Sequence, residues 1–227
     1  MDNLIEYKAR NSEDVFFVRE GTSDQLVVNE CYGKMYLNDR TNYNSNDIVL
    51  DVGCNIGAFS TRVSKHVNKI ISYEPEVNNF ALAKKNFERN NVQNVEIHNY
   101  ALVANDDPTL TFYVNTLKNK GMHSIIPTKG RDTITINCRR FSTALAESKA
   151  NKVKLDVEGA EWSIFNENHI DWSNVENIIM EWHQAHLKDK DQSKFEWLLS
   201  YLGKHFNHVH APKPTMKSWT SIIFASK

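Results

Sequence analysis

The amino-acid sequence predicts an α/β fold built on an open, parallel β-sheet. Residues 48–63 begin with an apolar run, pass through a turn that contains Gly53 and Gly57, and continue with apolar residues at helical spacing. A buried strand followed by a glycine-rich turn and a helix is the nucleotide-binding unit of such sheets. The chain has 227 residues, of which 41% are hydrophobic, so a single domain with a filled core is expected.

Composition narrows the possible partners and the compartment. The net charge of −1 gives no reason to expect general binding of nucleic acid or a polybasic membrane anchor. The three cysteines are widely spaced and form no zinc pattern, which indicates reduced thiols. No apolar run approaches the ~20 residues that span a bilayer, and the first residues do not begin a signal peptide. We therefore expect a cytoplasmic protein without a membrane span.

The first 46 residues are expected to form an N-terminal β cap or extension, and residues 47–227 the main domain. Val15–Val18 and Gln25–Val28 are strand-like, and Glu20–Asp24 between them has turn chemistry. A hairpin is predicted here. It would either cover the sheet or line an acceptor pocket.

The turn between Gly53 and Gly57 favours a nucleoside without a pyrophosphate. A dinucleotide turn needs a glycine where this chain has Asn55, whose side chain would crowd a pyrophosphate. This disfavours a nicotinamide-dependent reductase, the alternative at the level of the fold. Asp51 at the end of the first strand is expected to accept a hydrogen bond from an amine or water. Glu74 after the next strand is placed to accept hydrogen bonds from two ribose hydroxyls.

The remaining elements continue the alternation. An amphipathic helix is predicted over residues 76–91, followed by a strand over 95–98, and Asn99 and the Ala101 backbone are expected near an adenine. Residues 115–132 lack periodicity and are predicted to be either a substrate-facing lid, with His123 as a candidate base, or a disordered loop. The other predicted strands are 109–114, 133–138, 152–157, 175–182, 206–210 and 220–225, and the other helices are 141–149 and 193–205.

Three segments together resemble the FkbM family of S-adenosylmethionine-dependent methyltransferases: Asp51–Ser60, Tyr73–Pro75 and Val153–Glu161. The first segment alone would indicate only a class I methyltransferase, and the Asp-Val-Glu-Gly-Ala-Glu run of the third is more specific. The resemblance implies a Rossmann-like sheet, mostly parallel with an antiparallel last strand, and O-methylation, commonly of a sugar or polyketide hydroxyl. The expected cofactor-binding residues are Asp51, Gly53, Asn55, Gly57, Phe59, Glu74, Pro75, Asn99, Ala101 and Asp156.

Candidates for the chemistry follow the fourth and fifth strands of the predicted sheet. Alternation places Asp156 and Glu158 on one face if their strand persists, and Glu181 and His183 likewise. Either His183 or Glu158 takes the proton of an acceptor hydroxyl directly, or the four residues hold a divalent cation such as magnesium that lowers the pKa of the hydroxyl. A structural alternative is that neighbouring acids, Glu161 above all, cap the helix that starts at Ala160 or pair with lysines.

Three functions are compatible with these features. The leading hypothesis is an O-methyltransferase acting on a sugar or glycan. The second is an O-methyltransferase of a small metabolite that is not a sugar. The third is a non-catalytic module that accompanies a glycosyltransferase, since family members resembling this chain can be fused to such enzymes. The intact acidic run at 156–161 argues for catalysis.

Overall fold

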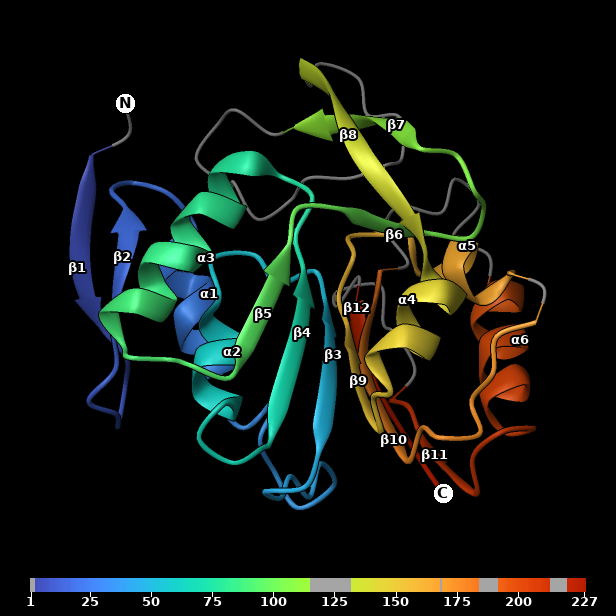
Figure 1. Ribbon diagram of the computed structural model, residues 1–227. Helices are drawn as coiled ribbons and strands as arrows, with labels where there is room; N and C mark the ends of the chain where they lie inside the picture. Colours follow the sequence, from blue (N-terminus) through green and yellow to red (C-terminus); the bar gives the residue numbers. More distant parts are fainter. Residues whose placement is uncertain (1–2, 115–131, 168, 184–191, 213–219) are drawn as a thin grey trace.

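The computed structural model describes residues 3–114, 132–167, 169–183, 192–212 and 220–227. Figure 1 shows a central sheet with helices on both sides. The described strands are β1 (Leu4–Lys8), β2 (Val15–Arg19), β3 (Ile48–Val52), β4 (Lys69–Tyr73), β5 (Val95–His98), β6 (Ala101–Val103), β7 (Thr109–Val114), β8 (Asp132–Arg140), β9 (Lys152–Leu155), β10 (Asn177–His183), β11 (His208–His210) and β12 (Thr220–Ser226). The described helices are α1 (Asp24–Cys31), α2 (Ala58–Val63), α3 (Val77–Arg89), α4 (Phe141–Ser148), α5 (Glu161–Phe165) and α6 (Gln192–Leu202).

The central sheet has seven strands in the order β11-β12-β10-β9-β3-β4-β5. The pairs β10/β9, β9/β3, β3/β4 and β4/β5 are parallel, whereas β12 is antiparallel to both β10 and β11. The predicted mostly parallel sheet with an antiparallel last strand is therefore confirmed. Because the parallel strands end at one edge, the residues that follow β3, β4, β9 and β10 meet there.

Two apolar layers hold the helices against opposite faces of this sheet. Leu50 of β3 packs with residues of α4, α5 and α6 in one buried cluster. Its neighbour Val49 packs with residues of α1, α2 and α3 in another. Consecutive strand residues point to opposite faces, which explains this division. Figure 1 shows the two helical layers on either side of the strands.

The N-terminal region is a hairpin and a helix, which corrects one prediction. The strand that pairs with β2 is β1, antiparallel, and residues 25–28 lie in α1 instead. In α1 the buried residues Asp24, Val28 and Cys31 recur at helical spacing, and the Asp24 carboxylate forms a buried ion pair with Arg19. A run of four apolar residues does not distinguish strand from helix by periodicity, so this segment was open to misassignment.

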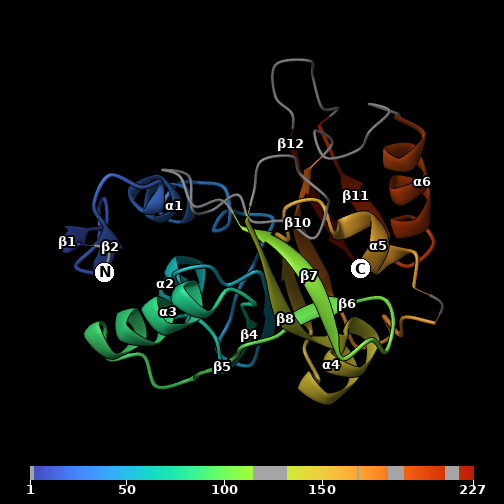
Figure 2. The ribbon, with the colours of Figure 1, turned by 90° about the horizontal axis from the view of Figure 1, so that it is seen from above.

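A second, three-stranded sheet lies over the carboxyl edge of the central one. Its order is β6-β8-β7, with β8 parallel to β6 and antiparallel to β7. Figures 1 and 2 show it above the ends of β3 and β4. The strands predicted at 109–114 and 133–138 are confirmed, and β8 extends to Arg140. Of the lid predicted at 115–132, residues 115–131, with His123, lie outside the described residues, and Asp132 begins β8.

Two expectations from composition can be compared with the structure. The three cysteines, Cys31, Cys54 and Cys138, are all buried free thiols, as predicted for reduced cysteines. Within the described ranges, every helix is too short or too polar to cross a bilayer.

Candidate active site

A pocket opens where the parallel strands end, beneath the three-stranded sheet. The space within it, counted together with the open solvent at its mouth, is about 640 Å³. Its walls come from the ends of β3 and β4, the start of β6, the loop after β9, Phe112 of β7 and Asn79 of α3. The lining residues are Val52, Gly53, Asn55, Tyr73, Glu74, Pro75, Asn79, Tyr100, Ala101, Leu102, Phe112, Asp156, Val157, Glu158 and Ala160.

The two glycines of the turn after β3 serve close packing. Gly53 has a φ of 84°, and a Cβ there would stand 1.8 Å from the carbonyl oxygen of Asp156. Gly57 has a φ of 86°, and its Cβ would meet the Phe87 ring of α3 at 2.8 Å. Gly53 therefore brings the pocket wall against the loop after β9. Gly57 brings α2 against α3 and is outside the pocket lining.

One end of the pocket presents a single fixed carboxylate. The Asn55 N–H donates to Glu74 Oε2 at 2.7 Å, and the Glu76 N–H donates to Oε1 at 2.9 Å. Burial raises the pKa of Glu74 to about 7, against the effect of these hydrogen bonds. Asn99 does not line the pocket but donates to the Glu74 and Pro75 carbonyls at 2.8 and 3.0 Å, which fixes the loop after β4. Glu74 is thus oriented to accept hydrogen bonds, as ribose recognition requires.

Asp51 and Phe59, both expected to bind the cofactor, are not among the residues that line the pocket. Asp51 is fully buried; Ser60 Oγ donates to its Oδ2 at 2.6 Å, and Lys154 Nζ lies 3.2 Å from its Oδ1. The Phe59 ring packs edge-on against Tyr36. A buried carboxylate with these partners contributes to holding the turn, because ion pairing and hydrogen bonding take up its charge.

Lys154 is the cation at the base of the site, and sequence reasoning missed it. Its Nζ donates to the Gly53 carbonyl at 2.6 Å and lies 3.8 Å from Asp156 Oδ2. Burial alone would lower the pKa of Lys154, but Asp51 and Asp156 raise it, so the ammonium stays charged. A lysine between Val153 and Leu155 in a predicted buried strand was the available signal, because such a charge needs buried partners.

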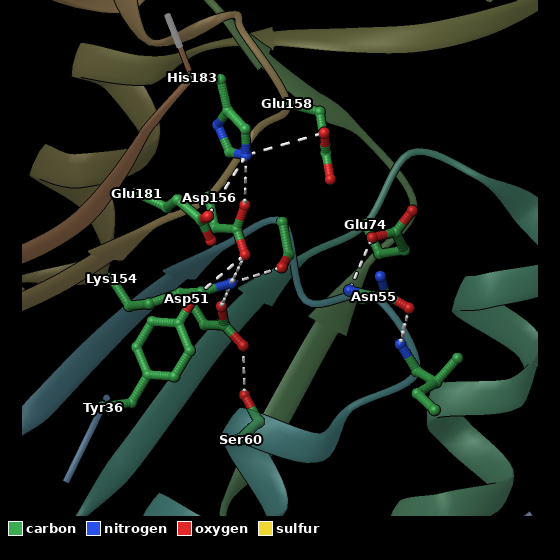
Figure 3. Close-up of polar contacts among 12 residues, drawn as sticks. Tyr36, Asp51, Asn55, Ser60, Glu74, Lys154, Asp156, Glu158, Glu181 and His183 are labelled. Carbon is green, nitrogen blue, oxygen red and sulfur yellow. Dashed lines mark hydrogen bonds and ion pairs between the residues drawn. The ribbon is translucent and has the colours of Figure 1, made fainter. Parts of the chain in front are cut away.

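At the other end of the pocket, which Asp156 and Glu158 line, these two acids and Glu181 of β10 surround His183. Its Nε2 lies 3.9 Å from Asp156 Oδ1, 3.7 Å from Glu158 Oε2 and 3.8 Å from Glu181 Oε1 (Figure 3). The reason differs from the one predicted: β9 ends at Leu155, and Glu158 has a φ of 52°, so strand alternation does not place Asp156 and Glu158 together. A tight turn does.

Glu161 fixes the histidine ring. Its Oε1 lies 2.8 Å from His183 Nδ1, and only 1% of Glu161 is exposed. Glu161 sits in the first turn of α5 and also accepts the Gly159 N–H at 3.1 Å. Burial alone would lower the pKa of His183, but Glu161, Glu158 and Asp156 raise it well above its ordinary value. Glu161 was predicted only as a helix cap or a lysine partner; its pairing with a residue 22 positions away carries no local signal.

Protonation states divide the candidate bases. The acids around His183, Glu161 first, raise the pKa of its ring and so favour the protonated form, whereas burial, followed by the charge of Asp156, raises the pKa of Glu181 to about 7. A carboxylate is therefore the better direct base in this arrangement. The same group of atoms also has the composition of a cation site.

Comparison with known proteins gives one family for most of the chain. The family model described as "Methyltransferase FkbM domain" matches residues 51–209. A methyltransferase of Sordaria araneosa, sdnD, is 24% identical over 233 residues, which cover 86% of this chain and 85% of that protein.

Solved structures show the same fold. The crystal structure of a methyltransferase FkbM from Methylobacillus flagellatus KT superimposes with a TM-score of 0.57 and 13% identity, over 85% of this chain and 47% of that one. A dimethyladenosine transferase from Plasmodium falciparum gives a TM-score of 0.52 and 11% identity, over 88% of this chain and 60% of that one. This chain therefore corresponds to about half of the Methylobacillus protein.

Proposed function

The chain belongs to the FkbM family of methyltransferases, and on this premise we propose that it transfers the methyl group of S-adenosylmethionine to a hydroxyl oxygen of a sugar or glycan. The observation that carries the proposal is the pocket with two unlike ends: Glu74, held for ribose hydroxyls, and the carboxylates around His183. A nucleoside fits the first end, and an acceptor that must lose a proton fits the second.

The fit of the cofactor is supported by the hydrogen bonding of Glu74. Each carboxylate oxygen accepts one backbone N–H and retains a lone pair for a further donor at the pocket. Pro75, Tyr100 and Ala101 provide apolar wall beside it, as a purine requires. The cofactor supplies an activated methyl group on a sulfonium.

The chain's own residues then have to position the acceptor and remove a proton. Methyl transfer forms a bond between the acceptor oxygen and the methyl carbon while the bond from carbon to sulfur breaks. The acceptor proton passes to a carboxylate of the acidic end, for which Glu181 has a pKa of about 7. The pocket contributes most by holding the acceptor oxygen in line and at near-attack distance.

The cofactor half of the proposal is tested by titration calorimetry and thermal unfolding with S-adenosylhomocysteine. The wild type is expected to bind it and to unfold at a higher temperature in its presence. Glu74→Ala should remove that shift. Glu96→Ala, which removes an exposed carboxylate paired with Lys69, should retain it. Absence of binding by the wild type overturns the proposal.

The acceptor half is tested by transfer of a labelled methyl group to a panel of free sugars, glycosides and non-sugar alcohols. Labelling confined to sugars is the expected result, with alkali-stable ether linkages in the product. Labelling confined to non-sugar alcohols would replace the sugar by a small metabolite. Binding of S-adenosylhomocysteine without labelling of any acceptor would identify a non-catalytic module, of the kind that could accompany a glycosyltransferase.

A further inference from the structure

We propose that Asp156, Glu158 and His183 bind one divalent cation at the acceptor end of the pocket, an inference that rests on the proposed function for its role but not for its existence. One carboxylate oxygen from each acid and one imidazole nitrogen lie within 4.8 Å of one another. The three residues come from the loop after β9 and from the end of β10, two neighbouring strands of the sheet.

The distances from His183 to the two acids are longer than direct hydrogen bonds between these residues would be. His183 Nε2 lies 3.7 Å from Glu158 Oε2 and 3.9 Å from Asp156 Oδ1, both beyond the usual range for a hydrogen bond. Around an ion with bonds of about 2.1 Å, adjacent ligand atoms stand about 3 Å apart. Closing the two His183 edges to this spacing takes less than about 1 Å each, and the Asp156 and Glu158 oxygens lie within 4.8 Å of each other.

Two of the three proposed ligands, His183 and Asp156, are already oriented by partners on their far sides. His183 Nδ1 lies 2.8 Å from the buried Glu161, which turns Nε2 toward the acids. Asp156 Oδ2 accepts the Tyr36 hydroxyl at 3.3 Å and faces Lys154 at 3.8 Å, which leaves Oδ1 as the oxygen nearest His183. Carboxylates that hold the second nitrogen of a ligating histidine are a regular feature of metal sites. Figure 3 shows Tyr36 and Lys154 on the side of Asp156 that faces away from His183.

The donor set selects the kind of cation. Two carboxylates and one imidazole, with no thiolate, suit Mn²⁺ and then Mg²⁺ among common ions, because Ca²⁺ prefers oxygen alone and structural zinc sites use Cys and His. Glu181, whose Oε1 lies 3.8 Å from His183 Nε2, would accept a hydrogen bond from a water on the ion. Local charge also favours a cation, since among the described residues five carboxylates lie near the imidazole of His183 or the ammonium group of Lys154.

The position suggests what the ion would do. Asp156 and Glu158 also line the cofactor pocket, so an ion between them would lie beside the reacting groups. Three protein ligands leave three positions of an octahedral ion for water or for acceptor oxygens. An acceptor with two neighbouring oxygens, such as a vicinal diol, would occupy two of them, and coordination would lower the pKa of its hydroxyl.

The test is a titration with Mn²⁺ followed by electron paramagnetic resonance, because bound and aqueous Mn²⁺ give different signals. We expect one Mn²⁺ per chain in the wild type and competition by excess Mg²⁺. Glu158→Gln should weaken binding by more than ten-fold. Glu161→Gln, which only releases the histidine ring, should weaken it by about 10-fold or more. The control Glu96→Gln removes an exposed carboxylate that pairs with Lys69 and should bind as the wild type does.

The same variants are also tested for folding, so that loss of Mn²⁺ binding is not confused with loss of structure. Cooperative thermal unfolding shows which variants are folded, and Asp156→Asn replaces Glu158→Gln if the latter does not fold. The proposal is overturned if the folded wild type binds no Mn²⁺ at 1 mM, or if the ligand variants bind it as tightly as the control does. Mn²⁺ binding without binding of S-adenosylhomocysteine would leave the cation site standing while refuting the proposed methyltransferase cofactor site.

Discussion

At the Glu74 end of the pocket, two backbone N–H groups hold one carboxylate, whereas at the acidic end several side-chain charges surround one imidazole ring. The first end is made from a turn and a loop that are contiguous with β3 and β4. The second is made from side chains whose partners lie on other elements, such as Glu161 of α5 and Tyr36 of the N-terminal region.

This difference predicts which kinds of substitution should damage each end of the pocket. A site held by backbone groups depends on the path of the chain, so it is sensitive to backbone sterics and tolerant of distant charge changes. A site held by side-chain charges depends on their balance, because a buried charge without a partner is costly. Lys154 and Gly53 connect the two ends: the ammonium binds the Gly53 carbonyl and faces Asp156.

Gly53→Ala should have the largest effect, because it breaks both ends at once. The new Cβ would overlap the Asp156 carbonyl oxygen at 1.8 Å, where only backbone movement gives relief. We expect a loss of at least about 4 kcal/mol in the free energy of unfolding and loss of S-adenosylhomocysteine binding. Urea denaturation and calorimetry measure the two effects.

The matched control is Gly21→Ala. Gly21 has a similar φ of 74° but open space around its Cβ position, so it carries the conformational cost without the collision. A cost of about 1 kcal/mol is expected. Equal losses for the two variants would show that φ alone, and not the contact with Asp156, determines the need for glycine at position 53.

Lys154→Met should have the next largest effect. It leaves Asp51 buried without its counter-charge, and we expect about 3 kcal/mol of destabilisation in urea denaturation. Adding Asp51→Asn should recover a large part of that loss, because the uncompensated charge is removed. Lys69→Met, at an exposed ion pair with Glu96, should change stability by less than about 1 kcal/mol. A double variant no more stable than Lys154→Met would assign the loss to packing.

The same contrast explains what the sequence could predict. The strand, turn and helix at 48–63 and the position of Glu74 follow from local pattern, and the structure has both. The structure also brings the candidates Asp156, Glu158, Glu181 and His183 together, because residues at the ends of parallel strands meet at one edge. Their pairing was not predictable: the Glu161 contact with His183 depends on the position of α5 relative to β10.

Tertiary contacts also explain where Asp51 and the N-terminal elements differ from their predicted places. Asp51 belongs to the motif, yet it is not among the residues that line the pocket because Lys154 and Ser60 take its carboxylate, and only the three-dimensional arrangement shows this. In the N-terminal region, β1 was missed and α1 was predicted as a strand because both are short. Short segments take their conformation from tertiary packing more than from their own periodicity.

Glu74→Gln should affect only the end held by backbone groups. One of the two N–H groups would face an amide nitrogen, and we expect about a 10-fold loss of S-adenosylhomocysteine affinity with Mn²⁺ binding unchanged.

The contribution of Glu74 to the stability of the unliganded protein should depend on pH. Because the pKa of Glu74 is raised to about 7, its stabilisation of the unliganded protein is present at low pH and lost as pH rises through 7.

Cofactor affinity should move in the opposite direction. Ribose hydroxyls donate to an ionised carboxylate, so affinity should rise between pH 6 and pH 8, by up to about 10-fold for a single group with this pKa. Calorimetry across this range measures it, and the Glu74→Gln variant should lack this component. An affinity that falls as pH rises in the wild type would show that Glu74 binds the cofactor in its protonated form.

Glu30→Gln should have the smallest effect and only at the acidic end. Partial desolvation, and then the charges of Asp156 and Glu158, raise the pKa of Glu30, which places this N-terminal carboxylate in the field of the proposed cation site. Removing its charge should weaken Mn²⁺ binding by about 2-fold to 3-fold through long-range electrostatics and leave S-adenosylhomocysteine affinity unchanged. Glu13→Gln, an exposed carboxylate of the same region paired with Lys8, should change neither. Weaker cofactor binding by Glu30→Gln, with Mn²⁺ binding unchanged, would contradict this prediction. It would show that Glu30 acts on the Glu74 end of the pocket and not on the acidic end.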